Sequence, residues 1–316
     1  MSRKISTLGA LVAILLSAAG PVGAADKFTV LLDWFVNPDH GPLFVAQERG
    51  YFTAVDLDVT LIAPSDPNDP PRLVAARKGD VAISYQPQLH IQASKNLPLM
   101  RIGTLVATPL NSLVVLDDGP IRQIADLRGK KVGYSVGGFE TALLRAMLEK
   151  HGLALKDIEL VNVNFALSAS LMSGKVGAVI GAYRNFELNQ MDLKKRPGRA
   201  FFVEEEGVPA YDELIYVAHK DRVRDPKMRR FLEAVERGVQ YLVNYPARSW
   251  KLFIKGREKK LDTELNRRAW RDTLPRFALR PAALDTRRYE VFATFLKKQG
   301  IIKTVKPVSH YATELK

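Results

Sequence analysis

Short apolar runs alternate with amphipathic stretches along the first part of the chain. Three runs have the length and the apolar or period-two pattern of strands, at residues 28–32, 57–62 and 81–84. Between them, residues 43–50 and 72–78 have helical patterns, and the first of these stretches ends at Gly50, a typical helix stop. Strands that alternate with helices in this way predict a parallel sheet of the α/β class.

The same order of elements recurs farther along the chain. Residues 131–134, 160–163 and 178–180 have the pattern of strands, with helices predicted over 139–151 and 166–173. The helix, glycine and strand of residues 73–83 have a counterpart in residues 171–180. Two lobes of like topology are the simplest arrangement that accounts for this repetition.

Two further apolar runs place the predicted lobe boundaries. Residues 112–116 and 214–218 flank the second set of elements and would act as the hinge. The first lobe is therefore predicted to be discontinuous, because the chain leaves it and returns to it. The expected organisation is a first lobe of residues 26–116 and 214–316 and a second lobe of residues 117–213. From Pro226 onward the pattern is mostly helical.

The first 25 residues have the pattern of a targeting segment. Arg3 and Lys4 precede an apolar run over residues 8–16, and small residues follow up to Ala24 and Ala25. A basic start, a short apolar core and a small-residue end are typical of a secretory signal peptide. The apolar core is shorter than the ~20 residues that span a bilayer. We therefore expect residues 1–25 to be removed and the mature protein to be soluble in the periplasm.

The chain contains no cysteine. This excludes disulfides, cysteine-ligated metal sites and the lipid-modified cysteine of a lipoprotein. The five histidines are scattered without metal-ligand spacing, and the sequence has no phosphate-binding or dinucleotide-binding glycine motif. We therefore predict no metal site and no cofactor.

The formal net charge is +13, from 47 Lys and Arg against 34 Asp and Glu. The basic surplus lies after residue 220, in doublets such as Arg229-Arg230 and Lys297-Lys298 that are interleaved with acidic residues. Dispersed doublets of this kind indicate solvated helix faces rather than a nucleic-acid surface. The charge therefore predicts no nucleic-acid partner and gives no guide to the substrate.

Three stretches, residues 32–41, 47–52 and 79–87, carry a resemblance to a known family. The sequence resembles the periplasmic pyrimidine-precursor binding proteins of ABC importers, within the thiamine-pyrimidine synthase-like group. The resemblance implies a two-lobed periplasmic binding protein fold of type II, with the ligand cleft between the lobes. It also implies a thiamine-related pyrimidine as ligand, of the formyl-aminopyrimidine or hydroxymethylpyrimidine type, and a membrane permease as partner. We expect the binding protein itself to be a monomer.

Candidate ligand contacts in the first lobe follow two predicted strands. In α/β lobes the ligand lies at the carboxyl ends of strands, and an aminopyrimidine needs aromatic faces, an acceptor for its amine, and amide or imidazole groups. The candidates of these types are Asp33, Trp34, Asn37, His40, Tyr85 and Gln86. A structural role is the alternative for each: Trp34 as a core side chain, Asn37 as a turn residue and His40 as a helix-terminal residue.

In the second lobe the candidates lie in two loops. Ser135, Gly137, Gly138 and Phe139 belong to a loop between strand and helix whose backbone N–H groups could approach a phosphate or formyl oxygen. The alternative there is a tight turn. Tyr183 and Glu187 follow a buried strand, where Tyr183 could stack on the ring and Glu187 could accept from its amine. The alternative for both is a solvated surface position.

Two other functions stay open on the sequence alone. The protein could bind another small solute, such as riboflavin, a sulfonate or nitrate, because importer proteins for these solutes share the element at residues 79–84. It could also be a relative of the pyrimidine synthases that consume pyridoxal phosphate and carry a cysteine-rich metal segment. Ser84 stands where their imine-forming lysine is expected, and cysteine is absent. We therefore predict a binding protein rather than an enzyme.

Overall fold

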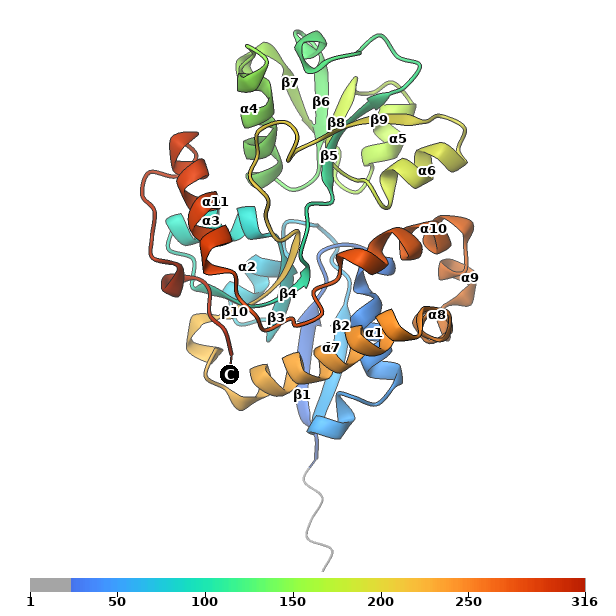
Figure 1. The fold of residues 1–316 in the computed structure, drawn as a ribbon, viewed down its shortest axis with the longest axis vertical. Coiled ribbons are helices and arrows are strands. Elements are labelled where there is room, and N and C mark those ends of the chain that lie inside the picture. Colours follow the sequence, from blue (N-terminus) through green and yellow to red (C-terminus); the bar gives the residue numbers. More distant parts are fainter. Residues whose placement is uncertain (1–23, 316) are drawn as a thin grey trace, which may run out of the picture.

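The computed structural model describes residues 24–315, which form two lobes joined by two crossing segments (Figure 1). Each lobe is built on a five-stranded sheet with helices packed against it. Nearly all of the predicted signal peptide, residues 1–25, lies outside the described residues. In the described part of the chain, no helix combines the length and apolar character needed to cross a membrane.

The first sheet has the strand order β2-β1-β3-β10-β4. β1 is parallel to β2 and β3, whereas β10 is antiparallel to β3 and β4. Both faces are covered, so apolar side chains point both ways: Val30 packs in one apolar cluster with Phe231, and Leu31 packs in another with Leu89. The strands are β1 (Asp26–Leu31), β2 (Leu57–Ile62), β3 (Val81–Ser84), β4 (Leu99–Val106) and β10 (Leu214–His219).

The second sheet has the order β7-β6-β8-β5-β9 and the same mixed pattern. β6 is parallel to β7 and β8, whereas β5 is antiparallel to β8 and β9. The strands are β5 (Asn111–Leu116), β6 (Lys131–Tyr134), β7 (Glu159–Asn162), β8 (Ala178–Tyr183) and β9 (Gly198–Phe202).

Helices connect these strands and then form the C-terminal part of the chain, which wraps around the first lobe (Figure 1). The longest helix, α7, starts where Asp225 accepts a hydrogen bond from the Lys227 backbone N–H, and Pro226 occupies its first turn. The helices are α1 (Gly41–Glu48), α2 (Pro70–Ala75), α3 (Gln86–Ser94), α4 (Phe139–Lys150), α5 (Leu167–Met172), α6 (Glu187–Leu193), α7 (Pro226–Asn244), α8 (Pro246–Ile254), α9 (Glu258–Leu261), α10 (Glu264–Thr273) and α11 (Thr286–Lys298).

The structure corrects two details of the predicted topology. The sheets are mixed rather than purely parallel, because the chain enters the second sheet on β5 and re-enters the first on β10, and both strands run against their neighbours. The first lobe was expected to extend to residue 116, but β5 is a strand of the second sheet. The crossings from one sheet to the other therefore lie at residues 107–110 and 203–213.

Helix α3 was not predicted, and its burial explains why. Its polar residues Gln86, Gln88, His90 and Gln92 are all buried, so the helix has no polar outer face. A helix that is buried on all sides lacks the amphipathic spacing on which recognition from sequence depends.

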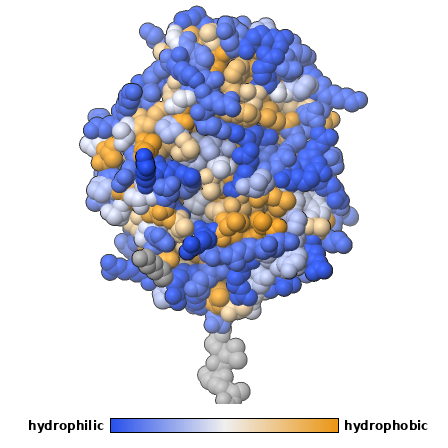
Figure 2. All heavy atoms as spheres, in the orientation of Figure 1, coloured by the Kyte–Doolittle hydropathy of each residue, from blue (hydrophilic) through white to orange (hydrophobic). Residues whose placement is uncertain are grey.

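The outer surface is mostly hydrophilic in the view of Figure 2, with smaller apolar patches between the polar side chains. Apolar and hydrophilic residues both reach the surface in the zone where the two lobes meet, midway along the long axis.

Candidate functional site

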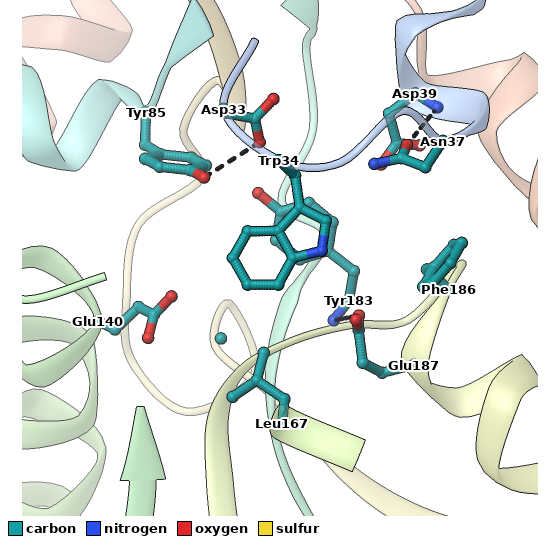
Figure 3. Close-up of a pocket in the computed structure, with 11 residues that line it drawn as sticks. Asp33, Trp34, Asn37, Asp39, Tyr85, Glu140, Leu167, Tyr183, Phe186 and Glu187 are labelled. Atoms are coloured by element: carbon teal, nitrogen blue, oxygen red, sulfur yellow. Dashed lines mark hydrogen bonds between the residues drawn. The ribbon is translucent and has the colours of Figure 1, made fainter. Parts of the chain in front are cut away.

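A cavity lies between the two lobes, at the carboxyl ends of β1 and β8. It encloses about 400 Å³ of space not filled by protein atoms, counting its open mouth. Its wall is formed by Asp33, Trp34, Asn37, Asp39, Tyr85, Glu140, Leu167, Gly181, Tyr183, Phe186 and Glu187 (Figure 3).

The aromatic part of the wall is centred on Trp34. Its ring projects into the middle of the cavity, with Glu140 on one side and Glu187 on the other (Figure 3). Trp34 is partly exposed and meets Phe165 of the second lobe edge to face, with 4.5 Å between the ring centroids. It is therefore neither a core side chain of the first lobe nor a solvated one, but a side chain that reaches across the cleft.

Asp33 is held from two sides by buried groups. Its Oδ1 is 2.9 Å from His40 Nε2, and its Oδ2 accepts from the Tyr85 hydroxyl at 3.0 Å. His40 Nδ1 accepts from the Asn37 backbone N–H, which leaves the proton on Nε2 to be donated to Asp33. The carboxylate is thereby fixed in orientation at the end of the cavity next to Tyr85.

Glu140 extends from the first turn of α4 into the cavity. Its Oε2 accepts from the Ser135 backbone N–H at 2.7 Å. Gly181 lies against the carboxylate in a left-handed conformation with φ of +101°. A Cβ atom at position 181 would lie 2.5 Å from Glu140 Oε1, so the carboxylate occupies space that only glycine leaves free.

The remaining polar groups of the second-lobe wall are Glu187 and Tyr183. Glu187 Oε2 accepts from the Tyr183 backbone N–H at 2.7 Å, in the first turn of α6. The Tyr183 hydroxyl donates to Oε1 of Glu213 at 3.3 Å. Glu213 is fully buried behind the wall, where its Oε2 also accepts from the Tyr211 hydroxyl at 3.0 Å.

The cavity is electrostatically acidic. Burial raises the pKa of Glu140 to about 8, and the neighbouring Glu213 and Glu187 carboxylates add to this rise. Burial likewise raises the pKa of Glu187 to about 7 and that of Asp39 to about 6. Within residues 24–315, the wall contains four carboxyl groups and no lysine or arginine. The site is therefore suited to a ligand that brings hydrogen-bond donors or positive charge.

The two lobes are in contact around the cavity. Asn185 Nδ2 of the second lobe donates to Asp39 Oδ1 at 2.6 Å and to Thr273 Oγ1 at 2.7 Å. On another side, the rings of Tyr85 and Phe139 stack across the cleft with 4.5 Å between centroids. The structure is thus a closed arrangement of the lobes.

The structure places half of the residues expected at the site in the cavity wall. These are Asp33, Trp34, Asn37, Tyr85, Tyr183 and Glu187. The other six, His40, Gln86, Ser135, Gly137, Gly138 and Phe139, lie outside the wall. Whether any of the twelve contacts a ligand stays a prediction.

In the first lobe, the two residues outside the wall have partners within the protein. His40 is fully buried behind Asp33, to which it donates. Gln86 is also fully buried, and its Oε1 accepts from the Asp212 backbone N–H at 2.7 Å. His40 holds Asp33 and Gln86 holds the Asp212 backbone. The polar groups of both side chains are thus used within the protein and do not line the cavity.

The glycine-containing loop of the second lobe is likewise engaged with the protein. Ser135 uses its backbone N–H to hold Glu140, and the Gly137 N–H donates to Asn68 Oδ1 of the first lobe at 2.9 Å. Phe139 is buried against Tyr85, and Gly138 is an exposed residue at the start of α4. The loop therefore orients a carboxylate and joins the lobes, and its contact with a ligand stays a prediction.

Five wall residues were not among the candidates. Asp39, inside the stretch that carried the resemblance, and Glu140, at the start of a helix, had sequence signals that could have found them. Leu167, Gly181 and Phe186 had none, because their place in the wall depends on how the two lobes face each other.

Comparison with known proteins identifies the family. Residues 37–249 match the family described as NMT1/THI5 like, which is more than half of the chain. The chain belongs to the NMT1/THI5-like family. This confirms the relationship that the sequence resemblance suggested, with the thiamine-pyrimidine group of proteins.

Three relatives show the range of proteins that this NMT1/THI5-like chain resembles. It is 51% identical over 295 residues to a Haemophilus influenzae protein whose name assigns it provisionally to thiamine biosynthesis, covering 93% of this chain and 94% of the relative. It is 31% identical to the formylaminopyrimidine-binding protein of Halalkalibacterium halodurans, covering 81% and 80%. It is also 29% identical to the 4-amino-5-hydroxymethyl-2-methylpyrimidine phosphate synthase of Uromyces fabae, covering 77% and 74%.

Solved structures confirm the predicted fold of the NMT1/THI5-like chain. The alkanesulfonate-binding protein of Xanthomonas axonopodis pv. citri aligns with a TM-score of 0.71 at 15% identity, covering 90% of this chain and 97% of that one. A Candida albicans protein described as having the generic periplasmic binding protein fold aligns with a TM-score of 0.70 at 17% identity, covering 92% and 97%. At these identities the likeness concerns the fold alone, which is the two-lobed periplasmic binding protein fold.

Proposed function

We propose that this protein is the solute-binding component of an ABC importer and captures a thiamine-related aminopyrimidine, of the formylaminopyrimidine or hydroxymethylpyrimidine type. It binds the pyrimidine between its lobes outside the cytoplasm and delivers it to a membrane permease. The observation that carries the proposal is the acidic, aromatic cavity of a chain that is 31% identical to a formylaminopyrimidine-binding protein.

The side chains of the cavity wall support an aminopyrimidine as the ligand. The flat ring of the ligand matches the aromatic faces of Trp34 and Tyr183. Its exocyclic amine carries two N–H donors, which the carboxylates of Glu140 and Glu187 can accept. An apolar residue, Leu167, completes the wall opposite Trp34 and suits the methyl group and ring carbons (Figure 3).

The same wall disfavours anionic solutes. A sulfonate or nitrate needs donors or cations, and placing it among four carboxyl groups in a closed cavity is electrostatically unfavourable. Arg184, the cation next to the hinge, is engaged outside the wall with Glu204, at 2.7 and 2.8 Å. The alternative of a sulfonate or nitrate carrier is therefore less well supported by the site.

The synthase alternative is also less well supported. A pyridoxal phosphate enzyme forms an imine with a lysine, and among the described residues no lysine lines the cavity. Ser84, which stands where that lysine is expected, is fully buried, and its hydroxyl donates to Gln88 at 3.1 Å. The residues that line the cavity are those expected of a protein that binds a ligand without converting it.

A ligand screen tests the proposal. Formylaminopyrimidine and hydroxymethylpyrimidine should raise the melting temperature, because a ligand that binds only the folded state stabilises it. Taurine, nitrate and riboflavin serve as the competing solutes. Trp34→Ala should remove the shift, whereas Glu205→Gln, which changes an exposed acid away from the cavity, should keep it. A shift with taurine, nitrate or riboflavin and none with either pyrimidine would contradict the proposal.

A further inference from the structure

Glu213 lies where the two crossing segments meet. It is the last residue of the crossing 203–213, directly before β10, and it is fully buried. Its Oε2 accepts from the backbone N–H groups of Leu110 and Asn111, at 2.6 and 2.9 Å, where the other crossing enters β5. One carboxyl group therefore ties together the two segments that join the lobes.

The other oxygen of Glu213 is bonded to the cavity wall. Its Oε1 lies 3.3 Å from the hydroxyl oxygen of Tyr183, which lines the cavity. Tyr183 is the last residue of β8, and its backbone lies opposite Asn111 in the pairing of β8 with β5. The backbone of Tyr183 is thus set by the first residue after one crossing, and its hydroxyl group is set by the last residue of the other.

The neighbouring acid, Asp212, is bonded differently. It is also buried, but its Oδ2 accepts from Thr104 Oγ1 at 2.8 Å, and its Oδ1 is paired with Arg288. Its backbone N–H donates to Gln86 Oε1 at 2.7 Å. Within residues 24–315, the partners of the Asp212 side chain all belong to the first lobe. Asp212 therefore anchors the crossing to the first lobe, whereas Glu213 reaches the other crossing and the wall.

The bond between Glu213 and Tyr183 does not depend on the charge of Glu213. Burial raises the pKa of Glu213 to about 7. Its Oε2 already accepts from Leu110, Asn111 and the Tyr211 hydroxyl, so a proton on this carboxyl group lies on Oε1. Oε1 then donates to the Tyr183 hydroxyl oxygen instead of accepting from it. The same two atoms are joined in both states, so the role of Glu213 is positional.

We propose that Glu213 is a positioning residue of the ligand site, which holds the ring of Tyr183 against the pyrimidine and ties this contact to the crossing segments. The inference rests on the proposed function, in which Tyr183 offers an aromatic face to the ligand. It adds that this face is correctly placed only while Glu213 holds the hydroxyl group. Because the same carboxyl group holds both crossings, a pyrimidine stacked on Tyr183 stabilises the closed arrangement through Glu213.

Two tyrosine variants test the link. Tyr183→Phe keeps the ring but removes the hydroxyl group that Glu213 holds. Release of formylaminopyrimidine, measured by stopped-flow tryptophan fluorescence, should accelerate by about fivefold. The matched control is Tyr289→Phe, because Tyr289 is a fully buried tyrosine whose hydroxyl donates to the adjacent acid, Asp212, at 3.4 Å. Its release rate should stay close to that of the wild type. An unchanged rate in Tyr183→Phe, or an equal acceleration in both variants, would overturn the inference.

A double variant separates positioning from direct contact with the ligand. Glu213→Ala removes the carboxyl group that holds Tyr183 and should also accelerate release. Adding Tyr183→Phe to Glu213→Ala should accelerate release no further, because the hydroxyl group has already lost its partner. Two effects that simply multiply would show that the Tyr183 hydroxyl contacts the ligand by itself, and would overturn the inference.

The conservative variant Glu213→Gln provides a rescue. Its amide oxygen can accept from the N–H groups of Leu110 and Asn111, while its amide nitrogen donates to the Tyr183 hydroxyl oxygen. Release should therefore return close to the wild-type rate. Release from Glu213→Gln that is as fast as release from Glu213→Ala would contradict a positional role.

Two further readouts keep the failure modes apart. Thermal unfolding of each ligand-free variant shows whether it folds, and the comparison of Tyr183→Phe with Tyr289→Phe decides the question by itself if Glu213→Ala does not. Absence of binding by either pyrimidine to the wild-type protein would overturn the proposed function and this inference together. Binding with equal release rates in the wild type and Tyr183→Phe overturns only the inference.

Discussion

The carboxylate of Glu140 fills the place that a side chain at position 181 would need. A Cβ atom on Gly181 would lie 2.5 to 2.7 Å from the two carboxylate oxygens and their carbon. The two residues come from different elements, α4 and β8, and both line the cavity on the second-lobe side. The glycine is therefore part of the site without offering any functional group.

Gly181→Ala should weaken pyrimidine binding strongly. The added methyl group would displace Glu140, and overpacking of this kind typically costs about 1–3 kcal/mol. If this free-energy cost weakens the complex with the ligand, the affinity falls by about tenfold or more. The control is Gly207→Ala, which shares a positive φ of +93° but whose Cβ would meet only a Lys150 side-chain carbon at 3.7 Å. Equal affinities for the two variants in calorimetry would show that position 181 does not shape the site.

Asn185→Ala should loosen the closed state. Asn185 joins the second lobe to Asp39 and Thr273, and all three side chains are buried. Loss of buried bonds to a carboxyl group is expected to accelerate ligand release, measured by stopped-flow fluorescence of Trp34, by about tenfold or more. Asn189→Ala removes an exposed bond to Asp272 and a bond to the Asn185 backbone oxygen, but leaves both bonds of the Asn185 side chain in place, and should change release much less. Similar release rates in both variants would contradict a role for the buried link.

The stability of the ligand-free protein should fall as pH rises from about 7 to 8. Burial raises the pKa of Glu140 to about 8 and that of Glu213 to about 7, whereas an unfolded glutamate titrates near about 4.3. In this window the folded state binds more protons than the unfolded one, so the free energy of unfolding decreases with pH.

One buried group works in the opposite direction at lower pH. Burial lowers the pKa of His90 to about 3, which makes stability rise with pH below about 6.5. The measurement is therefore restricted to the window above neutrality, where Glu140→Gln should show a flatter curve of melting temperature against pH. A wild-type melting temperature that is constant or rises between about pH 7 and 8 would contradict the expected burial of these acids.

Expression in a Gram-negative host tests the targeting segment. The full-length chain should yield a periplasmic protein whose N-terminus, by intact mass, lies at or just after Ala24 or Ala25. Replacing Leu11 and Leu15 with Lys shortens the apolar core and should leave an uncleaved precursor in the cells. A full-length protein in the periplasm, or a cleaved one from the double variant, would contradict the prediction.

The sequence predicted the elements whose patterns are local. The strands β2 and β3 coincide with the predicted runs, and the loop after β1 places Asp33, Trp34 and Asn37 in the cavity wall. These outcomes depend on residues that are neighbours in the chain, because strand alternation and a following polar loop are visible in a short window.

The features that were missed depend on distant parts of the chain. Whether Gln86 or His40 reaches the cavity is decided by partners such as Asp212 and Asp33, and Glu140 reaches it because Gly181 leaves room. The sheet to which β5 belongs is decided by pairing with β8 and β9, which lie far along the sequence. Local patterns carry no information on such pairings.

The place of β10 in the first sheet has a consequence for the order in which the protein folds. β10 lies between β3 and β4, yet it is synthesised only after the whole second sheet. Until residues 214–219 emerge, β3 and β4 have no strand between them, whereas all five strands of the second sheet are already present. The second lobe can therefore be completed first on the growing chain, and the first lobe, which contains the N-terminal strand, must wait for the C-terminal part. A chain with this order leaves its N-terminal strand in an incomplete sheet until its C-terminal part is available.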